Sequence, residues 1–558
     1  MGLGILQFAR KYSSTKCVTY FTTPIYYVNA EPHIGHLYSS VIADASKRWT
    51  QILHRDAKVM LSTGTDEHGT KIQRAAKVHQ TTLSGYCDKI SSQYRKLSDE
   101  FNVDYTDFIR TTQDRHKETV QNFWNVLAEK GLIYKSTYQG WYCVPDETFL
   151  SDSQLNEVER DGQKLLVSAE SGHPVEWSEE PNYIFRLSAF KDDLIYWLKK
   201  NEKAVVPHKF HKILLDIIHS DNALDDISVS RPSSRVHWGI PVPNDPDQTV
   251  YVWLDALVNY LTVAGYSQNP TDKFPQVWPP DVQVIGKDIL KFHGVYWPAF
   301  LMAAGLEPPR CLLCHSHWTV DSEKMSKSKG NVVNPMEKSD VFTADGLRYF
   351  LLREGVNHSD GNYGNKKVIQ LLNAELADTL GNLLSRCCGK ALNPDQVFPK
   401  MHPQSFSKIS SMQATSILLK NVELLPTVCQ QHYSDFNFYK AADAVIAALH
   451  AANVFFDTLK PWELRKSDST IDELHVVLHL CFETLRTAGI LLQPLMPNIS
   501  DSVLNKLNVP RSDRFFDNLQ QFSWQDERFQ TRPLGAEGSI LFKRILLDVA
   551  KNKAASHK

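Results

Sequence analysis

Lys324-Met325-Ser326-Lys327-Ser328 is the stretch that decides the fold, together with His33-Ile34-Gly35-His36 roughly 290 residues upstream. Each alone is a weak signal, because a lysine–serine cluster is usually a solvated loop and a histidine pair is often structural. Their chemistry converges, however. Lysines neutralise phosphate, and imidazoles in the first turn of a helix lie where the dipole and free N–H groups attract it. Together and in this order, the two stretches are a specific signal.

A buried strand and a helix are predicted on either side of the upstream stretch. The strand is Val18–Thr23, and Pro32 stands in the first turn of the helix that follows. His33 and His36 fall at i and i+3 on one face of that turn, and Gly35 leaves room for a nucleotide. This order is typical of the first unit of a nucleotide-binding sheet.

A second strand, Lys58–Thr63, is predicted to end in the turn Gly64–Gly69. Ligands of open α/β sheets gather at the carboxyl ends of strands, so Asp66, Glu67 and His68 are placed to meet a substrate. A turn made of glycine and aspartate would explain the same residues without any function.

The α/β pattern is interrupted near Lys135 by turn-rich, aromatic sequence and resumes after Val236. We expect a strand at Tyr251–Ala256, another ending at Gly286, and then a helix. That helix carries Ile289, His293 and Trp297 on one stripe at i, i+4 and i+8, a pattern more often of core residues than of a site. Cys311 and Cys314 lie in an apolar run that predicts a buried strand; a metal pair is the weaker alternative.

Beyond Lys366 apolar residues recur at helical spacing, which predicts an α-helical bundle. The fold class predicted is therefore α/β, a Rossmann-type parallel-sheet catalytic domain split by a connective insert and followed by an all-α bundle. The expected domains are a presequence (1–17), the first catalytic half (18–134), the insert (135–236), the second catalytic half (237–323), a loop and connecting segment (324–365), the helical domain (366–541) and a basic tail (542–558). The tail either contacts RNA phosphates or is simply solvated.

Composition describes a globular protein. The chain has 558 residues, 42% of them hydrophobic, and a formal charge of −2, so a nucleic-acid partner would have to meet a local basic patch. No run approaches eighteen uncharged apolar residues, which argues against a membrane span. The nine cysteines are scattered and odd in number, which indicates a reducing compartment and no disulfide framework.

The first 30 residues contain no Asp or Glu but do contain Arg10, Lys11 and Lys16 behind an apolar face. This is typical of a mitochondrial presequence cleaved before Tyr20. A disordered terminus is the alternative.

The motif pair resembles class I aminoacyl-tRNA synthetases, in which the two signatures bind one ATP from opposite sides. From about Tyr20 to Leu541 the chain is also similar to methionyl-tRNA synthetases, especially mitochondrial ones. The segments that carry this similarity are Phe21–Asn29, Gly64–Gly69, Val229–Arg231, Tyr251–Ala256, Ile285–Ile289 and Lys460-Pro461-Trp462.

The resemblance implies a methionine pocket, in which aromatic side chains favour the thioether and Asp66 pairs with the α-ammonium group. Such a pocket separates methionine from homocysteine by only about 1–3 kcal/mol for one methylene. The residues at the matching positions are Pro24, Ile25, Tyr27, Asp66, Trp253, Ala256, Leu257, Tyr260, Ile289, His293 and Trp297.

The reaction implied is activation of methionine by ATP, with Mg²⁺ accompanying the nucleotide, and transfer to the 3′ end of initiator and elongator tRNA. The methionine carboxylate is itself the nucleophile, so the enzyme positions groups and stabilises charge. The residues expected at ATP are His33, Gly35, His36, Arg231, Gly286, Asp288, Lys324 and Lys327, with Lys329 possible.

Many members of the family that the chain resembles bind zinc in the insert through Cys-x2-Cys pairs. The corresponding positions here are Cys143, Asp146, Ser168 and Ser171. One thiol does not make a tetrahedral zinc site, so we expect no structural zinc and no other metal site.

The helical domain resembles the family's anticodon-binding domain, since splayed anticodon bases are read by stacking and edge hydrogen bonds. The matching residues are Asn382, Arg386, Asn453, Pro461 and Trp462. For Trp462 a core role is the alternative. We further expect a monomer in the mitochondrial matrix, without membrane attachment.

Two other classes of protein are alternatives. Small-molecule nucleotidyltransferases share the upstream stretch, but they lack the insert and the helical domain. A non-catalytic RNA-binding relative would have lost its catalytic motifs, and here both are intact.

Overall fold

The computed structural model describes residues 16–143, 148–150, 152–160, 163–169, 171–220, 224–267, 273–325, 330–525, 530–536, 538 and 540–546. Three expected site positions lie outside these residues: Asp146, Lys327 and Lys329. So does the expected presequence, except for its last two residues, Lys16 and Cys17. By contacts the chain forms two compact units. The first comprises 1–32, 60–96 and 105–315, and the second comprises 33–59, 97–104 and 316–558.

The first unit contains a six-stranded sheet in the order β3-β2-β1-β14-β15-β9. The pairs β2–β3, β1–β14, β14–β15 and β15–β9 are parallel, which confirms the predicted α/β class. The strands are β1 (Val18–Tyr27), β2 (Lys58–Asp66), β3 (Asp107–Arg110), β9 (Val205–Val206), β14 (Val282–Gly286) and β15 (Leu312–His315). The apolar run with Cys314 is thus a buried strand, as predicted.

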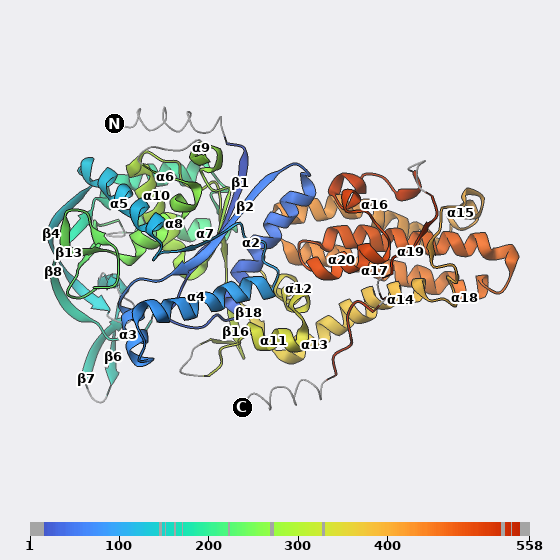
Figure 1. The fold of residues 1–558 in the computed structure, drawn as a ribbon, viewed down its shortest axis with the longest axis horizontal. Helices are drawn as coiled ribbons and strands as arrows, with labels where there is room; N and C mark the ends of the chain where they lie inside the picture. Colours follow the sequence, from blue (N-terminus) through green and yellow to red (C-terminus); the bar gives the residue numbers. More distant parts are fainter. Residues whose placement is uncertain are drawn as a thin grey trace. The chain divides into compact units, whose positions relative to one another are not determined.

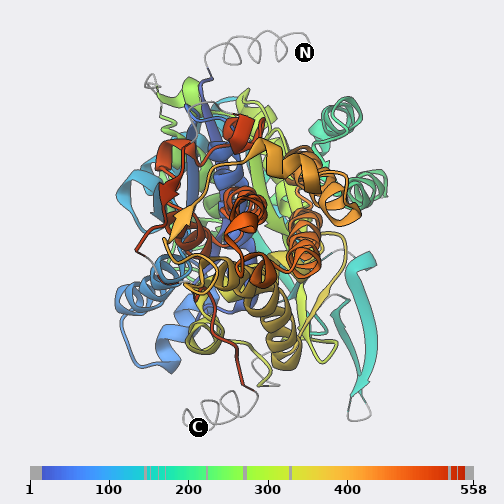
Figure 2. The same cartoon turned by 90° about the vertical axis from the view of Figure 1, so that its right-hand side faces the viewer.

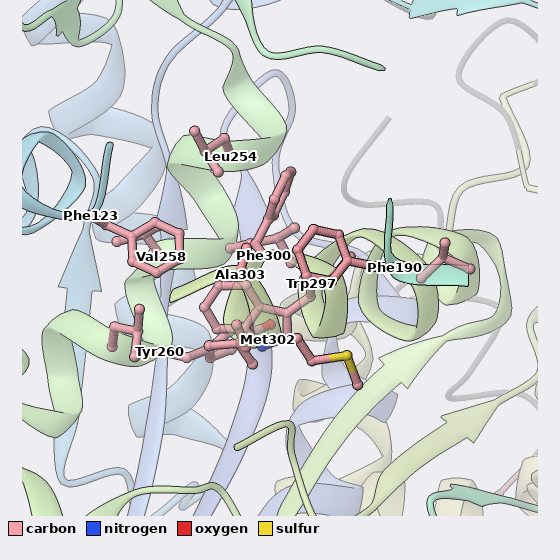
Figure 3. Close-up of a cluster of buried hydrophobic side chains, with 14 of the residues drawn as sticks. Phe123, Phe190, Leu254, Val258, Tyr260, Trp297, Phe300, Met302 and Ala303 are labelled. Carbon is pink, nitrogen blue, oxygen red and sulfur yellow. The ribbon is translucent and has the colours of Figure 1, made fainter. Parts of the chain in front are cut away.

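Helices of the first unit bury a large aromatic core with the sheet (Figure 3). They are α5 (Asp114–Glu129), α6 (Lys191–Lys200), α7 (His208–His219), α8 (Val252–Ala264), α9 (Lys273–Val277) and α10 (Trp297–Ala304). Phe123, Val258 and Trp297 meet in this core from three different helices. Helices α3 (Thr70–Val78) and α4 (Leu83–Glu100) form a second, smaller cluster with Tyr26 and Phe108.

Helix α8 corrects one prediction, because Tyr251–Ala256 was expected to be a strand. The β-branched and aromatic residues at its start favour a strand locally. The helix is nevertheless buried from Leu254 to Ala264, and it ends at Gly265 in the left-handed conformation. Burial on all sides removes the amphipathic pattern by which a helix is recognised, so tertiary packing decides the conformation.

The insert is a long antiparallel ribbon (Figure 1). β4 (Ile133–Cys143) pairs with β8 (Glu176–Phe185), and the hairpin of β6 (Leu155–Arg160) and β7 (Gln163–Ser168) extends away from the six-stranded sheet in both views (Figures 1 and 2). The short strands are β5 (Thr148–Leu150), β10 (Ile227–Ser228), β11 (Ser230–Pro232), β12 (Pro241–Val242) and β13 (Asp245–Val250). Since β9 already joins the central sheet, the sheet pattern resumes earlier than residue 236.

The second unit contains α2, which follows the upstream motif, and a helical bundle (Figure 2). Its helices are α2 (Ile34–Leu53), α11 (Pro335–Phe342), α12 (Ala344–Glu354), α13 (Asn365–Leu372), α14 (Asn382–Cys388), α15 (Pro403–Ile409), α16 (Gln413–Ser434), α17 (Phe438–Leu459), α18 (Pro461–Leu464), α19 (Ile471–Leu492) and α20 (Pro497–Lys506). Its strands are β16 (Trp318–Val320), β17 (Glu323–Lys324), β18 (Gly361–Tyr363), β19 (Val397–Phe398) and β20 (Arg532–Pro533).

Two bundle helices are long and apolar enough to cross a membrane by length and composition alone: Phe438–Leu459 and Asp468–Leu492. In the second, 94% of the most apolar window is buried inside the protein, and in the first 44% is. Helix α19 is buried at every position from Val476 to Leu492. The apolar residues of these helices are therefore the core of the bundle.

A buried ion pair anchors the second unit. Arg348 of α12 is fully buried and donates to Oδ2 of Asp44 in α2 at 2.6 Å. The same guanidinium donates to the carbonyls of Phe101, Pro494 and Leu495 at 2.9, 3.0 and 3.2 Å. Burial alone would raise the pKa of Asp44, but the arginines beside it outweigh burial and hold that pKa below its usual value.

Arg348→Met should destabilise the protein by about 3–5 kcal/mol, because it leaves the Asp44 carboxylate buried without its main partner. Denaturant unfolding followed by hydrogen exchange in α2 and α12 measures this loss. Arg55→Ala is the control: Arg55 pairs with Asp517 at the surface, so its loss should cost less than about 1 kcal/mol. Equal losses in the two variants would contradict the anchoring role.

Candidate functional site

The residues expected to form the methionine pocket all lie in the first unit, on β1, at the end of β2, on α8 and in the segment after β14. Pro24 is buried, whereas Ile25 and Tyr27 are half-buried on β1. β1 and β2 are neighbours in the sheet, and Asp66, 9% exposed, ends β2. These residues therefore gather at one end of the sheet, where ligands of such folds bind.

His293 and Tyr260 form the most defined contact of this group. Nδ1 of His293 lies 3.1 Å from the carbonyl of Ile289, so this nitrogen carries the proton and donates it. Nε2 then accepts the hydroxyl hydrogen of Tyr260 at 2.8 Å. Burial lowers the pKa of His293 to about 4, more than the Ile289 carbonyl raises it. The imidazole is thus neutral and fixed in one tautomer.

The segment that carries His293 is not the regular α-helix that the sequence predicts. Lys287–Ile289 is a 3₁₀ turn, Phe292–Tyr296 is a π-helix, and α10 begins only at Trp297. A π-turn contains one residue more than an α-turn, so it rotates the residues before it relative to the residues after it. Ile289, His293 and Trp297 therefore do not lie on one face of a regular helix. His293 and Trp297 nevertheless both contact Tyr260.

Aromatic rings surround the Tyr260–His293 pair. The Trp297 ring lies 5.9 Å from that of Tyr260 and is fully buried, and Trp253 stacks on Phe292 with centroids 3.5 Å apart. Trp253 and Phe292 also line a small cavity of about 50 Å³. Nothing in the sequence singles out Phe292, since a phenylalanine within a predicted apolar helix carries no signal of its own.

The motif Gly64–Gly69 divides into residues with different tasks. Glu67 is fully buried and accepts hydrogen bonds from Arg110 at 2.7 and 3.0 Å. His68 lies 2.6 Å from Oδ2 of Asp255. Glu67 and His68 are thus both engaged by buried partners, while Asp66 ends the strand, and the expectation that these three residues meet a substrate stays a prediction.

Asp255 joins the end of β2 to α8 and α5. Its Oδ1 lies 2.8 Å from Nε2 of His116, which is fully buried and whose Nδ1 lies 3.0 Å from Oγ1 of Thr262. Burial raises the pKa of Asp255, but the His68 and His116 imidazoles outweigh it and leave the pKa below its usual value. Sequence reasoning missed His116, because nothing local distinguishes it on an amphipathic helix.

In the second unit, His33 precedes α2 as its N-cap, so the helix begins one residue after the position expected for the first histidine. Nδ1 of His33 accepts the backbone N–H of Gly35 at 3.1 Å, and Nδ1 of His36 accepts that of His33 at 3.1 Å. The rings stack with centroids 3.7 Å apart. An imidazole that accepts at Nδ1 is neutral and carries its proton on Nε2, so both rings present an N–H donor there.

Gly35 is required by this arrangement. A Cβ at position 35 would lie 2.9 Å from Cε1 of His33, a distance that side chains do not tolerate. The glycine thus makes room for the His33 ring that caps the helix.

The stretch with Lys324 lies close to this helix start. β17 ends at Lys324 and pairs with β16, and residues 326–329 lie outside the described part. The backbone N–H of Ile34 donates to the carbonyl of Val333 at 3.0 Å. Tyr38 of α2 packs edge-on against Trp318 of β16, with centroids 5.7 Å apart. The first turns of α2 thereby contact segments that precede and follow residues 326–329 within the same unit.

Three further residues expected at ATP are in the first unit. Gly286 ends β14 fully buried in the sheet, and a Cβ there would lie 2.5 Å from Oδ1 of Asp288. Arg231 is 3% exposed and donates to Oγ of Ser228 at 2.8 Å. Its guanidinium lies over the ring of Tyr251 at 4.3 Å and lines the same cavity as Trp253.

The residues expected to contact the anticodon meet partly on one face of the bundle. Arg386 lies 4.3 Å over the Phe456 ring and forms an ion pair with Asp457, and the Trp462 ring lies 6.4 Å from that of Phe456. Trp462 is 41% exposed, so it is not a core tryptophan.

Of the other three expected anticodon residues, Asn382 is exposed, and two are less accessible. Asn453 donates to the carbonyls of Thr379 and Leu449 at 3.1 and 3.0 Å, and Pro461 is buried at the start of α18. In the tail, Arg544 pairs with Asp378 at 2.5 Å, so this cation already has an acidic partner.

The insert positions compared with zinc ligands do not offer a tetrahedral thiolate set in the described residues. Cys143 is buried, and the Ser168 hydroxyl accepts the Ser171 N–H at 3.3 Å. The expected absence of zinc stays a prediction.

Comparison with known proteins identifies relatives over nearly the whole chain. A family model described as tRNA synthetases class I (M) matches residues 19–388. The mitochondrial methionine–tRNA ligase of Homo sapiens is 47% identical over 541 residues, which cover 94% of this chain and 90% of that protein. A probable mitochondrial methionine–tRNA ligase of Dictyostelium discoideum is 43% identical over 535 residues, 94% of this chain and 92% of that one.

A solved structure agrees with these relatives. Mycobacterium tuberculosis methionyl-tRNA synthetase in complex with methionyl-adenylate matches with a TM-score of 0.87 at 34% identity. The match covers 94% of this chain and 100% of that one.

His293→Gln should remove a pH dependence of stability. The unfolded imidazole takes up a proton near pH 6.5 and the folded one only near pH 4, so stability is complete above pH 6.5. Between pH 6.5 and 4 the wild-type protein should lose up to about 1.4 kcal/mol per pH unit relative to the variant. Unfolding curves across this range measure the difference. The exposed His219→Gln control should follow the wild type; a parallel fall in His293→Gln would refute the assignment.

Proposed function

Because this chain belongs to the class I methionyl-tRNA synthetases, we propose that its own residues activate methionine as methionyl-adenylate and pass it to initiator and elongator tRNA(Met) in the mitochondrial matrix. The enzyme is a methionine–tRNA ligase that uses ATP. The observation that supports the residue assignment is the hydrogen bond from Ile34 to Val333, since it joins the start of α2 to the segment that follows the downstream stretch.

The carboxylate of methionine attacks the α-phosphorus of ATP and pyrophosphate leaves, so no protein nucleophile is required. The catalytic contribution is charge stabilisation by groups fixed before the reaction. His33 and His36 suit this task, because their Nδ1 atoms are engaged by the backbone and their Nε2–H groups are donors of the kind that phosphate oxygens accept. Neutral donors bind ATP without needing an acidic pH.

Lys324 and Lys327 supply positive charge for the leaving pyrophosphate, with Arg231 as a further cation. Gly286 and Asp288 contact the adenosine, and Gly35 keeps the helix start compact. Mg²⁺ accompanies the ATP phosphates when bound and adds charge neutralisation there.

Methionine binds among the aromatic residues of the first unit. The thioether gains from contact with rings such as Tyr27, Trp253 and Trp297, and Asp66 receives the α-ammonium group. The fixed polarity of the Tyr260–His293 hydrogen bond supports this binding, because a neutral imidazole leaves the pocket without a competing positive charge. The other pocket residues are Pro24, Ile25, Ala256, Leu257 and Ile289.

The anticodon binds to the face formed by α14, α17 and α18. Trp462, partly exposed, offers a stacking surface, and Arg386 offers donors and a planar group. Asn382, exposed at the start of α14, extends this face, and Asn453 and Pro461 hold its geometry.

The remaining proposals concern the ends, the domains and the assembly of the protein. Lys16 is buried and pairs with Asp281 at 3.0 Å, which favours presequence cleavage upstream of Lys16. We retain the domain order presequence, split catalytic domain, insert, connecting segment and anticodon-binding domain. The active form is a monomer without zinc in the insert and without membrane attachment.

Lys327→Ala should lower methionine-dependent ATP–pyrophosphate exchange by about 10²–10³-fold, because one charge on the leaving pyrophosphate is lost. Methionine binding, measured by equilibrium dialysis, should change by less than about twofold. Lys366→Ala, an exposed lysine on α13, should leave both unchanged. Exchange at the wild-type rate in Lys327→Ala would sink the assignment.

Trp462→Ala should reduce kcat/KM for tRNA charging roughly ten- to hundredfold, since stacking of one base contributes about 1–3 kcal/mol. Pyrophosphate exchange should stay normal, because it does not involve tRNA. Tyr196→Ala removes an even more exposed aromatic ring from α6, 56% against 41%, and serves as the control. Intact charging by Trp462→Ala would exclude a stacking role.

A further inference from the structure

Two imidazoles and a carboxylate lie together where α15 meets α19 in the second unit. His402 is the N-cap residue of α15, and Asp472 and His475 stand at i and i+3 in the first turns of α19. One ligand atom from each side chain can be chosen so that all three lie within 4.8 Å of one another. None of these residues has a part in the proposed binding of methionine, ATP or tRNA.

The distances fit a metal better than a hydrogen bond. Nδ1 of His402 lies 3.4 Å from Oδ1 of Asp472. Two ligands at about 2.0–2.1 Å from a tetrahedral Zn²⁺ are themselves about 3.4 Å apart, so this pair already has the required spacing. A strong imidazole–carboxylate hydrogen bond would be shorter, about 2.7–2.9 Å. The third ligand atom has to approach by at most about 1.4 Å, which rotation of a half-buried side chain allows.

The third ligand is available for coordination. Within the described part of the chain, the His475 imidazole has no hydrogen bond, and its ring contact is with His402, at 5.5 Å between centroids. Two neighbouring imidazoles with an aspartate can also be an ordinary surface arrangement. Here ligand atoms from two separate helices lie within 4.8 Å of one another, and the His402–Asp472 pair already has the spacing of two zinc ligands.

The charges around the cluster favour a cation. Asp472 and Glu473 in the first turn of α19 offset the positive end of its dipole. Glu473 is itself paired with Lys408 of α15 at 2.7 Å, so it does not compete for the metal. Asp395 acts on His475 with a second negative charge, and Arg465 opposes it.

We propose that His402, Asp472 and His475 form a site for a divalent transition metal of the Zn²⁺ class, with water completing the coordination. Two imidazoles and one carboxylate are ligands that Zn²⁺, Co²⁺ and Ni²⁺ share. The metal joins the start of α15 to the start of α19 and reinforces the Lys408–Glu473 pair. This site is separate from the insert, where a thiolate site is expected to be absent.

The test is Zn²⁺ binding by the full chain after chelator treatment, measured by competition with a chromogenic chelator and by Co²⁺ absorption spectra. All samples carry Cys17→Ser, because Cys17 is the exposed thiol among the described residues. We expect one Zn²⁺ per chain, and an affinity at least about tenfold lower in both His475→Ala and Asp472→Asn. Zn²⁺ should also raise the thermal midpoint of the parent and not of these variants.

His450→Ala, an exposed histidine on α17, is the matched control and should bind Zn²⁺ as the parent does. Methionine-dependent pyrophosphate exchange should be normal in every variant, which verifies folding and separates this proposal from the proposed function. Absence of stoichiometric Zn²⁺ binding by the parent would overturn the proposal. So would binding that His475→Ala and Asp472→Asn leave unchanged.

Discussion

The buried ion pair between Asp44 and Arg348 is the constraint on which the position of α2 depends. A fully buried arginine is costly unless every donor is satisfied, and Arg348 satisfies its donors with one carboxylate and with carbonyls from two distant loops. Residues from α2, the loop at Phe101 and the segment at Pro494 are thereby held to one side chain. Because Asp44 is part of α2, this side chain also fixes the position of the start of α2, where His33 and His36 lie.

Proton positions matter as much as side-chain positions. At the start of α2 the backbone donates to Nδ1 of both histidines, so each ring carries its proton on Nε2. In the first unit His293 has the opposite tautomer. The Ile289 carbonyl accepts its Nδ1–H, so Nε2 is left as the acceptor for the Tyr260 hydroxyl. In each case a backbone group selects the tautomer, and burial keeps His293 from gaining a second proton.

The sequence predicted the fold class, the bundle and the family, because these rest on motifs and on periodicity over long stretches. It failed where packing overrides local preference. The strand expected at Tyr251–Ala256 is the start of a helix buried on nearly every side, and the regular helix expected around His293 contains a π-turn. Partners from distant segments, such as His116 and Phe292, have no signal in sequence because only the folded chain brings them to Asp255 and Trp253.

A motif does not say which of its residues work on the substrate. In Gly64–Gly69 the three consecutive polar residues look equivalent in the sequence. In the structure, however, Glu67 is hydrogen-bonded to Arg110, and His68 is hydrogen-bonded to Asp255. Arg110 also pairs with Asp88 at 2.6 Å, so Glu67 belongs to a wider ion-pair group at the strand end. The same partners fix the backbone on both sides of the strand end, so the two buried residues hold their neighbour Asp66 in place.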